Sequence, residues 1–206
     1  PAGGCFLEME EAPGVTLSSW PIRGWWPETL SVAHQVLSGL EVLHRLGYAH
    51  LDLGPEQILV ESAEVPTPWV AEAAGDSEAA GASTRARLLD LGLAAPFGAA
   101  IGARGTPGSI APELLQLRSG WDARADLYAV GTILFELFTG QPAFPGRTVR
   151  EVLARQLEGP EPNPGEEAGL PPPVRDLVRE LLARDPAARP RSALETWQRL
   201  REQAPR

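Results

Sequence analysis

A short segment in the first third of the chain combines residue types that could carry out chemistry. Asp52 follows His50 by two residues, and Gln57 lies five residues after Asp52. In phosphoryl-transfer enzymes, an acidic residue on such a loop orients a hydroxyl nucleophile and accepts its proton. A side-chain oxygen five residues later can turn back to hold a metal ion. The segment therefore indicates metal-assisted phosphoryl transfer.

The elements on either side would hold this segment between a helix and a strand. A wide apolar face predicts a helix over residues 28–46, with Pro27 at its start and Gly47 at a left-handed stop. Residues 58–60 predict a strand, and residues 87–89 its hairpin partner. The apolar positions of the helix recur every three or four residues: Leu30, Ala33, Val36, Leu37, Leu40 and Leu43.

The second half of the chain is mainly helical in pattern. Within residues 121–140 one helix is apolar nearly all round, which predicts burial at the centre of the domain. Asp126 lies inside that helix and needs a partner, because an unpaired buried carboxylate is costly. Shorter helices are expected at 148–158 and 173–183, and Ser192 with Glu195 forms a capping box for the last helix.

Two segments have a less regular composition. Residues 5–17 predict a short strand that turns at Pro13 and Gly14. Residues 62–86 are rich in Ala, Gly, Pro and acidic residues without periodicity, which predicts a flexible insertion in the hairpin. A docking segment is the alternative for this insertion.

Composition excludes several classes of protein. The net charge of −9 argues against a nucleic-acid binder, which needs a basic face, and no apolar run is long enough to span a bilayer. The single cysteine, Cys5, excludes an internal disulfide framework and fits a cytoplasmic setting. All eighteen basic residues are Arg, so no lysine is available for catalysis.

The order and spacing of the motifs resemble the C-terminal lobe of serine/threonine-type protein kinases. The resemblance covers the whole chain, residues 1–206, except for the 62–86 insertion. The first half of the chain contains, in order, a hinge-like strand at 5–17, a long helix, the His-x-Asp loop at 48–60 and a strand pair. Asp-Leu-Gly at residue 90 and Gly-Thr-x-x-x-x-Ala-Pro-Glu, which ends at residue 113, come next. The series closes with Asp-x-Tyr-x-x-Gly on the buried helix and Asp-Pro-Ala-Ala-Arg-Pro at 185–190.

This resemblance implies a mainly α fold with short β-hairpins, the large lobe of a protein kinase. It also implies that the family's N-terminal lobe, with its glycine-rich phosphate loop and strand lysine, precedes Pro1 and is absent from this chain. Without that lobe the floor of the nucleotide cleft would be exposed, so a partner surface is expected to cover it. A protein substrate or client is the other implied partner.

The resemblance assigns roles to particular residues and implies ATP and Mg²⁺ as cofactors. Asp52 would receive the substrate's hydroxyl proton, and Thr106 would contact the catalytic loop. Asp90 and Gln57 would bind Mg²⁺. Four further residues would surround the adenine ring: Met9 as gatekeeper, Glu10 and Ala12 through their backbone, and Leu59 as the floor.

The resemblance also implies architectural contacts within the lobe. Glu113 would pair with Arg189 and so tie the activation segment, residues 90–113, to the late helices. Asp126 would accept hydrogen bonds from the backbone around His50 and Leu51.

Several positions depart from the family's pattern. Leu51 replaces the usual Arg, which pairs with a phosphorylated activation loop, and Gly54 replaces a lysine that steadies the γ-phosphate. Gln57 replaces an Asn, and Ser109 replaces an aromatic residue. Three functions follow: part of an active serine/threonine kinase, a pseudokinase that acts as a binding or scaffolding module in signalling, or an unrelated helical interaction domain.

Overall fold

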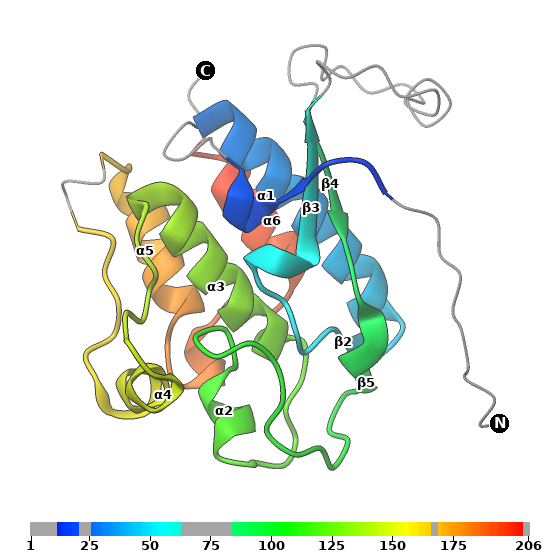
Figure 1. The fold of residues 1–206 in the computed structure, drawn as a ribbon, viewed down its shortest axis with the longest axis vertical. Coiled ribbons are helices and arrows are strands. Elements are labelled where there is room, and N and C mark those ends of the chain that lie inside the picture. The colour runs from blue at the N-terminus through cyan, green and yellow to red at the C-terminus, as the bar shows by residue number, and fades with distance from the viewer. Residues whose placement is uncertain (1–11, 21–25, 63–83, 166–168, 204–206) are drawn as a thin grey trace, which may run out of the picture.

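The computed structural model describes residues 12–20, 26–62, 84–165 and 169–203. This part of the chain is mainly helical with two small antiparallel sheets, as predicted (Figure 1). Its helices are α1 Trp26–Arg45, α2 Pro112–Leu115, α3 Arg124–Thr139, α4 Val149–Glu158, α5 Pro172–Leu181 and α6 Ala193–Arg201. Its strands are β1 Val15–Thr16, β2 Tyr48–Ala49, β3 Ile58–Ser62, β4 Thr84–Leu88 and β5 Ala95–Pro96.

The larger sheet has the order β1-β3-β4, and both pairs are antiparallel. Its register places Val15 opposite Val60 and Ile58 opposite Leu88. The hairpin is longer than the sequence indicated: Ser62 pairs with Thr84, so β4 begins inside the predicted insertion, and β4 ends one residue before Leu89. The rest of the insertion, 63–83, and most of the hinge-like segment, 5–11, lie outside the described residues.

Helix α3 forms the centre of the molecule, with α5 on one side and α1 and α6 on the other (Figure 1). Thirteen of its sixteen residues are buried, which confirms the expectation from its apolar composition. Helix α1 packs against β4 and α6, so it separates the hairpin from the late helices. Gly47 ends the turn after α1 with a φ of 81°, in the left-handed region expected for this stop. None of the helices among the described residues has the length and apolar character needed to cross a bilayer.

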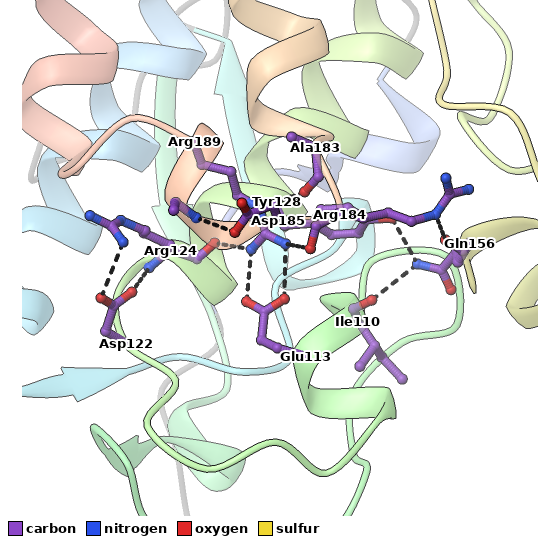
Figure 2. A network of polar contacts seen from close by, with 11 residues as sticks. Ile110, Glu113, Asp122, Arg124, Tyr128, Gln156, Ala183, Arg184, Asp185 and Arg189 are labelled. Atoms are coloured by element: carbon purple, nitrogen blue, oxygen red, sulfur yellow. Dashed lines mark hydrogen bonds and ion pairs between the residues drawn. The ribbon is translucent and has the colours of Figure 1, made fainter. Parts of the chain in front are cut away.

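A buried ion pair joins the segment before α3 to the loop before α6 (Figure 2). The Arg189 guanidinium donates to both oxygens of the Glu113 carboxylate, at 2.7 and 2.8 Å, which confirms the expected pair. Its Nε donates to the carbonyl of Ala183 and its Nη1 to the carbonyl of Arg124. One guanidinium thus ties α2 and the start of α3 to the end of α5, and Arg189 itself lies 76 residues after Glu113 and 65 residues after Arg124 in the sequence.

The ring of Tyr128 lies under this guanidinium, 4.9 Å from its central carbon. Burial raises the pKa of the Tyr128 phenol to about 12, although its hydrogen bond with Gln156 opposes the shift. The phenol therefore stays neutral at physiological pH, and it adds no negative charge beside Glu113.

Substitution of Glu113 tests the ion pair. Because Glu113→Gln leaves the buried Arg189 charge without its counterion, we expect the free energy of unfolding to fall by about 3 kcal/mol or more. Glu180→Gln is the matched control, since Glu180 pairs with Arg199 at the surface and such pairs contribute about 1 kcal/mol or less. Urea titrations of both variants measure the difference, and equal losses would contradict this account.

Close packing of α3 on α5 gives a second prediction. A Cβ at Gly131 would lie 2.8 Å from the Leu181 Cβ, so Gly131→Ala should lower the free energy of unfolding by about 1–3 kcal/mol through overpacking. At Gly39 in α1 a Cβ would meet the mobile end of Leu88 at 3.0 Å. Gly39→Ala should therefore leave the free energy of unfolding nearly unchanged, because alanine favours the helix by about 1 kcal/mol and this gain offsets the small shift of Leu88. The same titrations compare the two variants.

Candidate active site

The backbone of the loop after β2 is held by the buried carboxylate of Asp126. Its Oδ2 accepts a hydrogen bond from the His50 N–H at 2.8 Å, and its Oδ1 accepts one from the Leu51 N–H at 2.9 Å. Leu51 has a φ of 67°, which is unfavourable for a residue with a branched side chain. The expected hydrogen bonds from His50 and Leu51 to Asp126 are therefore present. They also hold the backbone of Leu51 in its left-handed conformation just before Asp52, which was not predicted.

His44 completes the environment of Asp126. Its Nε2 lies 2.8 Å from the Asp126 Oδ2, and its side chain is buried. A role for His44 in the site was not predicted from the sequence. Its position in line with Leu37 and Leu40 on the apolar face of α1 was the available signal, because a polar side chain there must find a buried partner.

Asp52 and Thr106 are brought together by the close approach of two segments. The Thr106 hydroxyl donates to Asp52 Oδ1 at 2.8 Å. The preceding Gly105 has a φ of 112°, and a Cβ on it would lie 2.6 Å from the Leu51 carbonyl oxygen. Only glycine fits that conformation and that approach. The contact between Thr106 and the catalytic loop is therefore present, while the catalytic roles of both residues remain predictions.

Asp90 and Gln57 belong to adjacent stretches of backbone. The Leu89 N–H donates to the Gln57 carbonyl at 2.8 Å, and the His50 Nε2 lies 3.0 Å from the Leu89 carbonyl oxygen. Asp90 has a left-handed backbone, its carboxylate accepts from the Gly92 N–H, and the residue is exposed. The loop of Asp52 is thus linked directly to the residue before Asp90.

The donor set of this region fits one Mg²⁺ ion. The Gln57 Oε1 is buried without a hydrogen-bond partner, so it is available as a ligand, and Asp90 offers an exposed carboxylate. No group of three His, Cys, Asp or Glu side chains with metal-binding geometry occurs among the described residues. Two protein oxygens with phosphate and water ligands match the usual coordination of Mg²⁺. Metal binding by these residues remains a prediction.

The substituted positions remove positive charge from the loop. Leu51 is 6% exposed and belongs to the hydrophobic core. Gly54 has no side chain, and a Cβ there would lie 3.1 Å from the Gln57 Oε1 and 3.7 Å from the Thr106 Cβ. A side chain at Gly54 would therefore project beside the Asp52–Thr106 pair.

The predicted adenine contacts are only partly covered by the structure. Leu59 is buried in β3, opposite Thr16, and Ala12 is half-buried at the start of the described residues. Met9 and Glu10 lie outside the described residues. The adenine-binding roles of these four residues remain predictions.

A cavity of about 310 Å³ opens beside the Asp52–Thr106 pair. Its walls come from residues 106–109, from Thr132 and Glu136 of α3, and from the segment that leads into α4. The Ser109 hydroxyl lies 3.1 Å from that of Thr132, which places two small polar side chains in the wall. The cavity was not predicted from the sequence. The small residues at 108 and 109, which leave space in its wall, were the feature that could have indicated it.

Comparisons with known proteins agree with this geometry. Residues 21–199 match the model of the protein kinase domain. The serine/threonine-protein kinase ULK3 of Mus musculus is 34% identical over 194 residues, which cover 89% of this chain and 36% of the mouse protein. The serine/threonine-protein kinase PknL of Mycobacterium tuberculosis strain H37Rv is 33% identical over 194 residues, covering 89% of this chain and 43% of that protein.

A third relative is the serine/threonine-protein kinase PknK of Mycobacterium bovis, which is 32% identical over 183 residues. The match covers 86% of this chain and 15% of that protein. The chain thus spans less than half the length of these three relatives. Because the domain model matches most of its residues, the chain belongs to the protein kinase family.

Proposed function

We propose that this chain is the large lobe of a serine/threonine protein kinase, which transfers the γ-phosphate of ATP to a protein hydroxyl. The observation that carries the proposal is the Asp52 carboxylate, which lies on a fixed backbone and is oriented by the Thr106 hydroxyl at 2.8 Å. The related serine/threonine-protein kinases support serine and threonine as acceptors. The single cysteine supports a cytoplasmic setting, where ATP is available.

The proposed step uses Asp52 as the proton acceptor. The hydroxyl oxygen of the protein substrate attacks the γ-phosphorus, its proton passes to the Asp52 carboxylate, and the bond to the bridging oxygen breaks as ADP leaves. Asp90 and Gln57 would hold Mg²⁺, which supplies positive charge to the phosphates. The remaining phosphate contacts would come from an N-terminal lobe outside this chain, because the chain contains no lysine.

A catalytically impaired binding module is the second candidate. Leu51 and Gly54 favour it, since neither provides a charge in the loop that surrounds Asp52. Such a module would keep the fold and the protein partner without transferring phosphate. The two candidates differ in whether Asp52 matters for turnover.

Substitution of Asp52 separates these candidates. In the full-length protein with Mg²⁺, radiolabelled ATP and a mixture of Ser- and Thr-containing peptides, Asp52→Asn should lower kcat by about 100-fold or more. Asp176→Asn is the control, because Asp176 is an exposed residue of α5 paired with Arg179 at the surface. No phosphate transfer by the wild type, or transfer that survives in Asp52→Asn, would refute the kinase proposal.

Restoring a cation at Gly54 gives a prediction specific to this loop. Gly54 has an extended backbone, so its φ does not oppose a side chain, although the Gln57 Oε1, 3.1 Å from the added Cβ, must shift slightly. Gly54→Lys would place an ammonium group beside the transferred phosphate. We expect kcat to rise about tenfold, because charge stabilisation dominates phosphoryl transfer. Gly54→Met is the control of similar length without charge. Equal rates for the two variants would show that charge at this position does not limit turnover.

A further inference from the structure

Gln156 is a fully buried amide that hydrogen-bonds one short stretch of backbone. Its Nε2 donates to the carbonyls of Gly108 and Ile110, at 2.9 and 3.1 Å, and its Oε1 accepts from the Gly108 N–H at 3.2 Å. Burying an amide is costly unless it is hydrogen-bonded, and here its bonds converge on residues 108–110 (Figure 2 shows the bond to Ile110). The side chain therefore acts as a clamp on that backbone.

The clamped stretch forms part of the cavity wall and follows the site residue Thr106. Gly108 and Ser109 line the cavity of about 310 Å³, and Thr106 lines it too while bonded to Asp52. Gly108 has a φ of 97°, and glycine has more backbone freedom than any other residue. A stretch of this kind needs an external contact to keep one conformation.

The base of the clamp is itself anchored. The Arg184 Nε donates to the Gln156 carbonyl at 3.0 Å, and its Nη2 donates to the Gly159 carbonyl. The Arg189 guanidinium, held by Glu113, reaches the Arg184 carbonyl at 3.5 Å (Figure 2). Helix α4 is thus fixed to the buried ion pair, and Gln156 extends this fixation to the cavity wall.

Phosphorylation within residues 91–105 cannot supply this order. Residues 91–105 contain no Ser, Thr or Tyr, and Leu51 puts an apolar side chain in the loop where a charge would meet a phosphate. The segment is instead held by contacts such as the Trp121 Nε1 to the Ala99 carbonyl at 3.0 Å. Gln156 makes the corresponding contact at the end nearest Asp52.

We propose that Gln156 is a positioning residue for protein-substrate binding, because its amide fixes the wall of the cavity beside Asp52 and Thr106. The inference rests on the proposed phosphotransferase function. It concerns the site of the protein substrate, since the Gln156 side chain hydrogen-bonds Gly108, Ile110 and Tyr128 and neither Asp90 nor Gln57. Loss of the clamp should therefore weaken affinity for the protein substrate and leave the ATP side unaffected.

The test uses Gln156→Met in the full-length protein, because methionine keeps the volume and removes the hydrogen bonds. We expect the KM for a peptide substrate to rise about tenfold, with kcat and the KM for ATP unchanged. Amide hydrogen exchange in residues 104–111 should accelerate about tenfold, since the Gly108 N–H loses its acceptor. Gln198→Met, at an exposed position of α6, is the matched control and should change neither readout.

A second variant covers the case in which Gln156→Met does not fold. Gln156→Asn keeps an uncharged amide but is one methylene shorter, so its hydrogen bonds to residues 108–110 should lengthen, and we expect a smaller rise in the peptide KM. The inference is overturned if the variants lower the melting temperature but leave both KM values and the amide hydrogen exchange of residues 104–111 unchanged. Gln156 would then have a structural role only. If the wild type transfers no phosphate, the proposed function fails, and exchange in residues 104–111 alone decides whether the clamp exists.

Discussion

The site depends on one buried carboxylate, that of Asp126 at the start of α3. It accepts the N–H groups of His50 and Leu51 and contacts His44, so a charge that would be costly in the core is satisfied by the loop it supports. The same bonds hold Leu51 in a left-handed conformation. Without them the loop would relax, and Asp52 would lose its direction towards Thr106.

A second fixed point lies at the other side of α3. The Glu113–Arg189 pair is inaccessible to water, and its guanidinium also satisfies the carbonyls of Ala183 and Arg124. Its bond to the Arg184 carbonyl continues towards α4 and Gln156. The central helix thus carries the catalytic loop at one contact and the activation segment at another, and both segments meet at the Asp52–Thr106 hydrogen bond.

The sequence predicted those parts of the site whose residues follow a motif or a clear period. The positions of Asp52, Thr106, Asp126 and Glu113 follow from ordered motifs, and the long helices follow from apolar spacing. The roles of His44 and Gln156 were not predicted, because each is a single polar residue on an apolar helix face. Their value depends on which distant backbone groups the tertiary fold brings to them. The full length of the β3–β4 hairpin was not predicted, because residues 84–86 lack the composition of a strand.

The exclusive use of arginine has a consequence for the chemistry of the interior. A guanidinium carries five N–H donors in one plane, so a single side chain can hold a carboxylate and backbone carbonyls at the same time. Arg189 does this with Glu113 and the carbonyls of Ala183 and Arg124, and Arg184 holds the carbonyls of Gln156 and Gly159. A lysine has three donors on a single nitrogen and could not make all of these contacts, so arginine and lysine are not interchangeable at these two positions.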